Sequence, residues 1–293
     1  MDGLIIVDKP EGWTSHDAVN KLRRLASTKK VGHLGTLDPM ATGVLPLVIG
    51  RATRLAQFFT KSAKLYEGTI RFGHSTDTYD REGKATSPET GPDLNRERLD
   101  VLFDRFRGLI QQTPPPVSAK KVGGTPAYKL ARKQIQVELK AVGVTVHSLE
   151  LLDFHEREAK VRIHCSAGTY VRAIAHEVGQ LAGCGAFLQS LRRLASGSFD
   201  ISQAHTIGEL EALSEDGRLG EVVIPGAKLL PEFPAEPVDA VTVGQIRQGR
   251  DFRVSPFRVR AGTRYVKALS PEGELVAIGE AKLPNLYHPI LVL

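Results

Sequence analysis

The chain has 293 residues, of which 41% are hydrophobic and 25% charged, with 28 glycines. These fractions are ordinary for a folded protein and exclude collagen-like, low-complexity and wholly disordered chains. Lysine and arginine together number 39 against 33 acidic residues, and the net charge of +6 favours a polyanionic partner such as nucleic acid without identifying one.

The first half of the chain is predicted to alternate short strands and helices. A strand is expected over 4–7, and Ser15 is predicted to cap the helix that follows it. Repeated glycine and proline in 31–50 predict a long irregular loop. The next three elements are expected to be a helix, a strand and a helix, over 52–59, 66–72 and 94–109.

A polar loop after the second predicted strand carries three carboxylates, at Asp77, Asp80 and Glu82. Their spacing does not match an EF-hand calcium loop, so we interpret the segment as a solvated acidic turn. The nine histidines do not cluster, and Cys165 and Cys184 are too few for a thiolate zinc site. We therefore expect no metal, and two lone cysteines favour a reducing compartment.

The second half of the chain adds a basic insertion and a separate unit at its end. The insertion, 120–140, carries six basic residues against one acid. A helix is predicted from about Thr169 to a glycine cap at Gly183. The proline-rich stretch 224–240 predicts a linker to a small, arginine-rich β unit. Strands are predicted over 143–154, 159–166 and 187–199.

Targeting and cofactor patterns are missing from the sequence. The apolar run at the start is short and follows Asp2, unlike a signal peptide, and no apolar stretch is long enough to cross a bilayer. We therefore expect a soluble, cytoplasmic protein with no membrane contact. Phosphate-binding and dinucleotide-binding glycine patterns are also absent, so no nucleotide cofactor is expected.

Segment 31–46 combines features that suit a reactive carboxylate. Asp38 precedes Pro39, which disfavours a helical backbone at Asp38. Gly35 and Gly43 permit close approach of a ligand or of another strand. The apolar neighbours of Asp38 would partly desolvate it, although residue type alone is also consistent with a simple turn aspartate.

The same segment resembles the catalytic signature of the bacterial TruB-type tRNA pseudouridine synthases. The signature is GHLGTLDPMATGVLP at 32–46. Four further segments agree with that family in order and spacing, namely 7–15, 64–68, 165–172 and 191–199. The similarity spans about residues 3–200 and is weak in the basic insertion.

The resemblance implies an α+β fold in two parts. A catalytic domain with a mixed, mainly antiparallel sheet flanked by helices is expected over 1–230, with 120–140 as an RNA-binding insertion. A small β-rich, PUA-like RNA-binding domain is expected over 238–293. The implied activity isomerises uridine at position 55, in the T loop of tRNA, to pseudouridine. The base is flipped out, its N-glycosidic bond breaks, the uracil rotates and C5 rejoins C1′. No cofactor is implied, the partner is the T-stem loop, and a monomer is expected.

The resemblance also implies roles for individual residues. Asp38 matches the catalytic aspartate, and Arg172 matches the arginine that pairs with it. Tyr66 matches the tyrosine that stacks on the target base, with its hydroxyl near C5. Four further residues are implied to bind the substrate: His33, Tyr170, Leu191 and Lys9.

Two other functions remain open at this point. An N-glycosylase would use Asp38 to release the base, and an RNA-folding factor would use only the basic surfaces. Three chemical steps are also open for Asp38 in an isomerase: attack at C1′, addition to the base, or removal of the C2′ proton.

Overall fold

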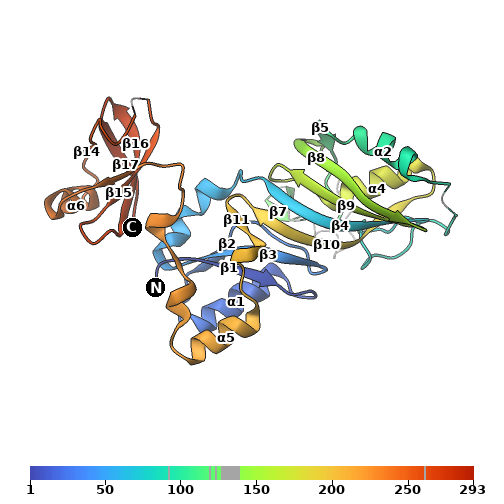
Figure 1. Cartoon of the computed structure of the whole chain (residues 1–293), viewed down its shortest axis with the longest axis horizontal. Helices are drawn as coiled ribbons and strands as arrows, with labels where there is room; N and C mark the ends of the chain where they lie inside the picture. The colour runs from blue at the N-terminus through green and yellow to red at the C-terminus, as the bar shows by residue number, and fades with distance from the viewer. Residues whose placement is uncertain (92, 119, 123, 127–138, 261) are drawn as a thin grey trace.

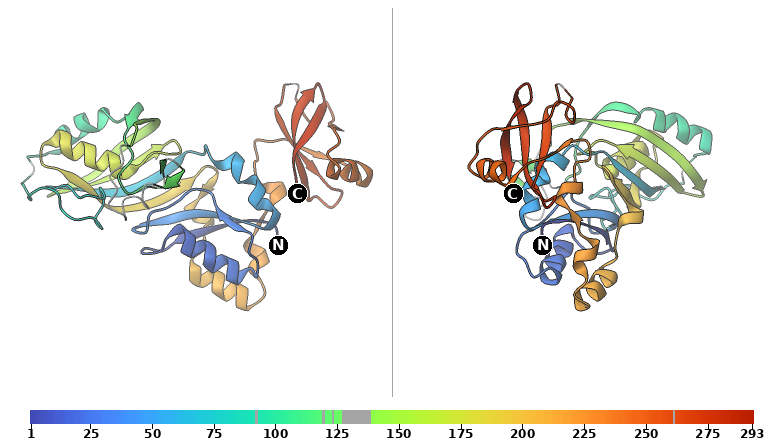
Figure 2. Two further views of the ribbon diagram at one scale, coloured as in Figure 1. Left: turned by 180° about the vertical axis from the view of Figure 1, so that it is seen from behind. Right: turned by 60° about the vertical axis from the view of Figure 1, so that its left-hand side comes forward.

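The computed structural model describes residues 1–293 except 92, 119, 123, 127–138 and 261, so most of the predicted basic insertion lies outside the described residues. The described chain forms a long curved sheet with helices packed on it, and a smaller β-rich unit that stands to one side (Figures 1 and 2). The predicted α+β class, with a mainly antiparallel sheet and a β-rich C-terminal unit, is confirmed.

Ten strands of the described chain form the large sheet, in the order β12-β1-β3-β10-β4-β9-β8-β5, with β2 beside β3 and β11 beside β10. Neighbours are antiparallel except β3 and β10, which run parallel. The bounds are β1 Gly3–Lys9, β2 Val31–His33, β3 Ala41–Ile49, β4 Lys64–Phe72, β5 Gly108–Gln112, β8 Val142–His155, β9 Glu158–Cys165, β10 Ala186–Ser196, β11 Phe199–Asp200 and β12 Ile224–Pro225. A separate short pair comprises β6 Lys121–Val122 and β7 Thr125–Pro126.

Helices cover the large sheet at both ends. Two of them, α1 and α5, lie together against the half that contains β1, whereas α2 and α4 cover the half that contains β8 and β10 (Figure 1). The inward side chains of these helices and of the sheet form one apolar core. The α-helices are α1 Ser15–Leu25, α2 Arg96–Asp104, α4 Val171–Ala182, α5 Ile207–Glu215 and α6 Ala240–Arg247. The 3-10 helices are η1 Gly50–Phe59, η2 Ile201–Gln203, η3 Leu219–Val222 and η4 Gly226–Lys228.

The C-terminal unit is a five-stranded sheet with α6 packed against it, in the order β13-β15-β16-β17-β14. Its strands are β13 Ala235–Pro237, β14 Phe252–Arg253, β15 Tyr265–Leu269, β16 Leu275–Leu283 and β17 Leu286–Val292. It has its own apolar core, but Ile278 and Leu291 instead join a second cluster with Leu4 and Val44 of the large sheet. The unit is therefore docked on the large sheet through buried apolar side chains.

The stretch 224–240, predicted to be a linker, is ordered and packed where it joins the two units. It contains β12, η4 and β13, and the last of these pairs with β15. Leu229 and Leu230 are buried in the cluster between the two bodies, and Lys267 donates its ammonium to the carbonyls of Ala227 and Leu229 (both 2.9 Å). Of the prolines on which the linker was predicted, Pro225 lies in β12 and Pro237 in β13, and the leucines between them are packed.

Three local predictions also need correction. The irregular loop expected over 31–50 is mostly β2 and β3, and only 34–40 is a loop. The helix α1 is capped by Thr14, which forms a reciprocal pair with Asp17, and Ser15 is its first residue. The helix expected over 94–109 ends at Asp104, before β5, whereas the helix predicted over 52–59 is confirmed as part of a 3-10 helix. The strands predicted over 66–72, 143–154 and 159–166, and the helix that ends at a left-handed Gly183, are confirmed.

Candidate active site

The loop 34–40 carries Asp38, and polar side chains from other elements hold its backbone. Ser15 donates its hydroxyl to the Leu37 carbonyl (3.0 Å) and accepts from the Leu37 N–H (2.8 Å). The buried ammonium of Lys9 donates to the Pro39 carbonyl (3.2 Å). Because the backbone is fixed on both sides of Asp38, the carboxylate is presented in a defined direction.

Arg193 on β10 holds the same loop from a third element. Its side chain is buried, and it donates to the carbonyls of Gly35 (3.1 Å), Thr36 (3.3 Å) and Val44 (2.6 Å). Gly43 lies opposite Arg193 across the parallel β3–β10 pair. A Cβ at Gly43 would lie 2.2 Å from the Arg193 carbonyl oxygen, and its φ of +99° is left-handed, so only glycine fits there.

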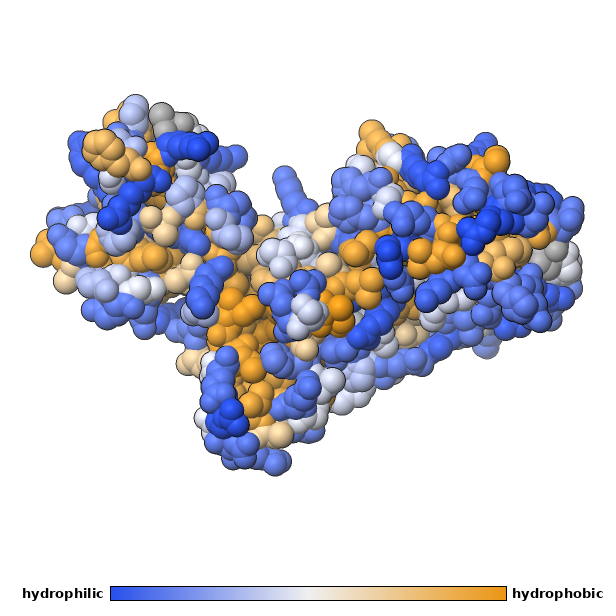
Figure 3. All heavy atoms as spheres, in the orientation of Figure 1, coloured by the Kyte–Doolittle hydropathy of each residue, from blue (hydrophilic) through white to orange (hydrophobic). Residues whose placement is uncertain are grey.

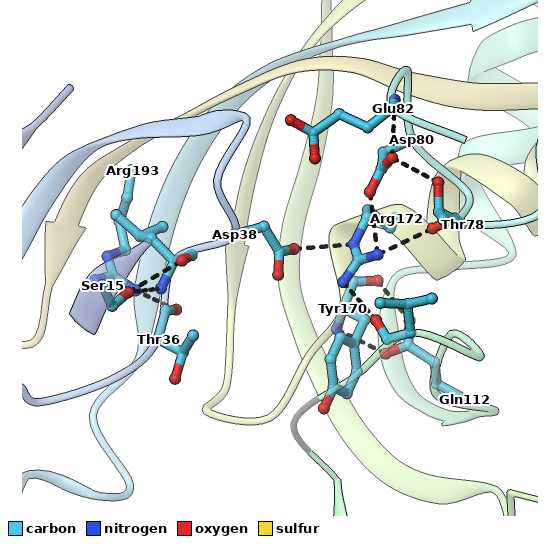
Figure 4. A network of polar contacts seen from close by, with 12 residues as sticks. Ser15, Thr36, Asp38, Thr78, Asp80, Glu82, Gln112, Tyr170, Arg172 and Arg193 are labelled. Atoms are coloured by element: carbon cyan, nitrogen blue, oxygen red, sulfur yellow. Dashed lines mark hydrogen bonds and ion pairs between the residues drawn. The ribbon is translucent and has the colours of Figure 1, made fainter. Parts of the chain in front are cut away.

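Arg172 lies between two carboxylates that come from distant parts of the sequence (Figure 4). Its Nε is 2.9 Å from Asp38 Oδ2, and its Nη1 is 3.1 Å from Asp80 Oδ2. The first contact is an ion pair without good hydrogen-bond alignment, since Nε–H does not point squarely at the oxygen. Nη1 also donates to the Thr78 carbonyl, and Nη2 donates to the Val117 carbonyl (both 3.0 Å). Arg172 is thus fixed by four partners, and one of them is the candidate catalytic group.

Asp80 is the functional residue that sequence reasoning missed. The loop around it was predicted to be a solvated acidic turn, but the Asp80 side chain is only 5% exposed. Its other carboxylate oxygen, Oδ1, accepts from the Thr78 hydroxyl (2.6 Å) and from the Glu82 N–H (3.0 Å). A buried carboxylate needs such partners. The missed signal was Arg172 itself, because a buried guanidinium has more donors than one aspartate can satisfy.

The start of α4 is positioned by Gln112 at the end of β5. This buried amide accepts from the Tyr170 N–H (2.8 Å) and donates to the Tyr170 carbonyl (3.1 Å), at the N-cap position. The Tyr170 side chain therefore has no capping role and is available beside Arg172 (Figure 4). Helix α4 consequently brings Tyr170 and Arg172 to Asp38.

A cavity of about 260 Å³ opens beside this network. Five residues singled out in the sequence line it, namely Asp38, Tyr66, Tyr170, Arg172 and Leu191. Tyr66 comes from β4 and lies directly opposite Arg193 across the β4–β10 pair. The Asp38 side chain remains 36% exposed, so it faces the cavity while Arg172 is enclosed. An aromatic side chain, an aliphatic one and a carboxylate on one cavity suit a flat polar ring with an attached sugar.

Burial shifts the ionisation of the two candidate reactive groups. The pKa of Asp38 is raised above its ordinary value, first by burial and then by the Asp80 charge, while Arg172 opposes the shift. Burial also raises the pKa of Tyr66, and the Arg193 guanidinium opposes that shift. The Tyr66 phenol is therefore protonated at neutral pH, and its conversion to a base would depend on Arg193.

Two predicted substrate-binding residues do not line the cavity. The Lys9 ammonium is enclosed by the carbonyls of Pro10, Trp13 and Pro39, so it supports the loop that carries Asp38. His33 is half-buried at the end of β2, and burial lowers its pKa. Among the described residues, no three histidine, cysteine or acidic side chains lie together in a way that could hold a metal ion.

Two family models match the chain in succession. The model of the TruB family pseudouridylate synthase N-terminal domain matches residues 23–171, and that of the tRNA pseudouridylate synthase B C-terminal domain matches 172–230. The chain belongs to the TruB family of pseudouridylate synthases. The predicted family is thereby confirmed, and so is the predicted enzyme class, because pseudouridine synthases are isomerases.

Curated relatives of this TruB-family chain match along nearly its whole length. A tRNA pseudouridine synthase B of Solibacter usitatus is 59% identical over 100% of both chains, and that of Dechloromonas aromatica is 40% identical over 99% of this chain and 94% of the relative. A solved H/ACA RNP bound to a substrate RNA containing 2′-deoxyuridine has a chain with the same fold, with a TM-score of 0.71 at 23% identity, covering 99% of this chain and 84% of the other. In the described part of the chain, no helix is long and apolar enough to span a membrane.

Proposed function

We propose that this chain isomerises uridine at position 55, in the T loop of tRNA, to pseudouridine, with Asp38 as the catalytic carboxylate. The observation that carries the proposal is the fixed chain Asp38–Arg172–Asp80 at the edge of a cavity that also contains Tyr66. The curated relatives, which are tRNA pseudouridine synthases, support tRNA as the substrate. We further propose that the chain acts as a monomer. We also propose that the enzyme acts in the cytoplasm.

The arrangement supports a reaction that begins at the sugar side of the flipped nucleotide. The uridine leaves the T-loop stack, at a cost of a few kcal/mol, and its base stacks on Tyr66. Asp38 Oδ2 faces Arg172, and no described residue donates to Oδ1, which stays free for the substrate. An ionised Oδ1 can attack C1′ or remove the C2′ proton, and either step expels the uracil from C1′. The cavity then holds the detached base while C5 turns towards C1′.

Tyr66 is proposed to act twice in this sequence. Its ring holds the base, and its hydroxyl receives the C5 proton once the new C–C bond has formed. Because burial raises the pKa of Tyr66, the phenol starts protonated. The isomerisation moves one proton from C5 to N1, so the phenol would give its own proton to the base and take the C5 proton in return, and Arg193 across the strand pair would stabilise the phenolate in between. Tyr170 and Leu191 are proposed to bound the base at the cavity wall.

RNA outside the cavity is proposed to bind the insertion 120–140 and a PUA-like domain over 238–293, on a catalytic domain over 1–230. In the C-terminal unit, Phe257 is 98% exposed at the tip of a turn, and the buried side chains of Val254 and Val259 anchor the two flanks of that turn. Figure 3 shows this unit as mainly hydrophilic on the face drawn. Five exposed arginines on the same segment form no ion pair with any described residue, namely Arg247, Arg250, Arg253, Arg258 and Arg260. Free cations and an exposed ring suit phosphates and an unpaired base.

The test is incubation of an unmodified tRNA transcript with the protein, followed by mapping of pseudouridine at single-nucleotide resolution. The proposal expects one pseudouridine, at position 55, and no loss of uracil from the RNA. Release of free uracil would instead identify an N-glycosylase. Modification at another position would refute the T-loop assignment.

A further inference from the structure

The cavity contains a buried lysine that the reaction described above does not use. Lys64 lies on β4, two residues before Tyr66, and is 8% exposed. Its ammonium donates to the Ser62 carbonyl, and it forms no ion pair with any residue that the structure describes. Together with Arg193, it places two cations on the cavity wall without an acidic partner.

The charges around the cavity do not balance. Its wall holds three cations, Lys64, Arg172 and Arg193, and one carboxylate, Asp38, while Asp80 contacts Arg172 from behind. One positive charge is therefore left over in a poorly hydrated site. Buried charges are costly unless they are paired, so a site that keeps an unpaired cation is suited to an anion that arrives with the substrate or forms from it.

The position of Lys64 indicates which part of the substrate carries that anion. Alternate residues of β4 are buried, so Lys64, Tyr66 and Gly68 share one face of the strand. A base stacked on Tyr66 would extend over its neighbours on this face. Gly68 has no side chain, and Lys64 presents an ammonium.

We propose that Lys64 is a catalytic residue that stabilises the negative charge of the uracil while it is detached from the sugar. When the N1–C1′ bond breaks, its electron pair leaves with the uracil, whose charge is shared by N1, O2 and O4. Lys64 would donate a hydrogen bond to a uracil oxygen without transferring a proton. Attack of C5 on C1′ then forms the new bond and neutralises the uracil, while the Asp38 carboxylate leaves C1′ or returns its proton to C2′. The C5 proton is lost afterwards and N1 gains one, so this last step leaves the base neutral. The inference rests on the proposed function and holds whether Asp38 attacks C1′ or removes the C2′ proton.

The ionisation of Lys64 makes this role testable by pH. Burial lowers the pKa of Lys64 to about 8, and Arg193 on β10 adds to that shift. Cys165 on β9 pairs with Lys64 across the sheet, but its pKa is raised to about 11, so it is a neutral thiol. The other ionisable groups on the cavity are Tyr66, Tyr170, Asp38 and Arg172. Above pH 8 the free enzyme would therefore lose the Lys64 charge.

The first experiment measures single-turnover pseudouridine formation with saturating enzyme on an unmodified tRNA transcript. Lys64→Met should lower the rate by about 100-fold, as loss of one donor to a developing anion does, with little change in tRNA affinity. Lys64→Arg retains the charge and should recover most of the rate. Lys61→Met removes an exposed lysine three residues away and serves as the matched control, with an unchanged rate.

The second experiment compares kcat/KM of wild type and Lys64→Arg between pH 6 and 10. The ratio of variant to wild type should rise above about pH 8, because arginine stays protonated while lysine does not. Taking the ratio cancels other groups that titrate in both enzymes, including Lys9, whose pKa is also lowered to about 8.

Two results would overturn the role of Lys64. One is a Lys64→Met variant with weaker tRNA binding and a normal single-turnover rate, which would place the ammonium on the RNA backbone. The other is a variant-to-wild-type ratio that does not change with pH. A wild-type enzyme that makes no pseudouridine would instead refute the proposed function, independently of both variants.

Discussion

Replacement of Asp80 by asparagine tests whether the second carboxylate is part of the active site. In wild type, Asp80 Oδ1 accepts from Thr78 and Glu82, and Oδ2 accepts from Arg172 at 3.1 Å. Asparagine keeps the shape and the first acceptor, but turns NH₂ donors towards the guanidinium. The variant loses one charge-assisted hydrogen bond, and its amide NH₂ faces the Arg172 N–H donors. Together these effects should lower the free energy of unfolding by about 3 kcal/mol.

The same change should also affect catalysis, because Arg172 would lose the partner that holds it against Asp38. A displacement of about 1 Å at a reacting group costs about 100-fold in rate, and we expect a loss of that order in single-turnover pseudouridine formation. The Asp80 charge raises the pKa of Asp38, so its removal should move the acid limb of the rate profile to lower pH.

Asp77→Asn is the matched control for this variant. Asp77 lies in the same loop, is exposed, and accepts only from the Lys84 N–H among the described residues. Its replacement should change neither the rate nor the urea midpoint appreciably. An Asp80→Asn enzyme with the rate and urea midpoint of wild type would show that Asp80 neither positions Arg172 nor stabilises the loop.

Further substitutions separate the other parts of the site. Arg172→Lys keeps the charge but loses the planar guanidinium that contacts several partners, so the reaction should stop before the glycosidic bond is cleaved. Isotope exchange at C1′ or C2′ equal to that of wild type would contradict this expectation. Tyr66→Phe keeps the stacking ring and should bind tRNA normally but stall after cleavage, whereas a wild-type rate would reduce Tyr66 to a stacking surface. Burial raises the pKa of Asp38, and its ionised form is the reactive one. As the pH is lowered, kcat/KM should therefore begin to fall at a pH above the ordinary pKa range of carboxyl groups. A kcat/KM that stays constant down to pH 4 would contradict that assignment. Phe257→Ala should weaken tRNA binding by about fivefold or more and leave the single-turnover rate of bound RNA unchanged, and equal affinity would show that the exposed ring does not contact RNA. Thr14→Ala removes the N-cap of α1 and should lower the free energy of unfolding, measured by urea titration, by about 1 kcal/mol without slowing catalysis. An unchanged urea midpoint would show that the cap does not contribute to stability.

The pairing of Asp38 with Arg172 was predicted from the resemblance of segments 32–46 and 165–172 to the TruB signature. Residue patterns alone were also consistent with a turn aspartate at 38, and a cation in the first turn of a helix only slightly favours a specific partner for Arg172. Asp80 could not be chosen over Asp77 or Glu82 in the same way. Which carboxylate turns inwards depends on contacts between the loop and α4, and these are 92 residues apart in sequence.

The fold was harder to predict where tertiary contacts override local preference. Glycine and proline in β3 favoured a loop, yet Gly43 is needed for close approach to β10 and Pro46 is paired with Ile6 in the sheet. The prolines of 224–240 predicted a linker but did not show that its leucines would fill the contact between the two units. Deletion of the C-terminal unit would consequently expose apolar surface, so single exposed residues such as Phe257 are the better probes of RNA binding.

The most direct test of the account is the single-turnover yield of pseudouridine from an unmodified tRNA transcript with Asp38→Asn at saturating enzyme. Asparagine retains the size of the side chain and the surrounding loop contacts but can neither attack C1′ nor accept a proton. We expect no detectable pseudouridine at position 55, together with tRNA affinity close to that of wild type. A rate within about tenfold of wild type, equivalent to about 1.4 kcal/mol of barrier, would contradict the assignment of Asp38 as the catalytic carboxylate.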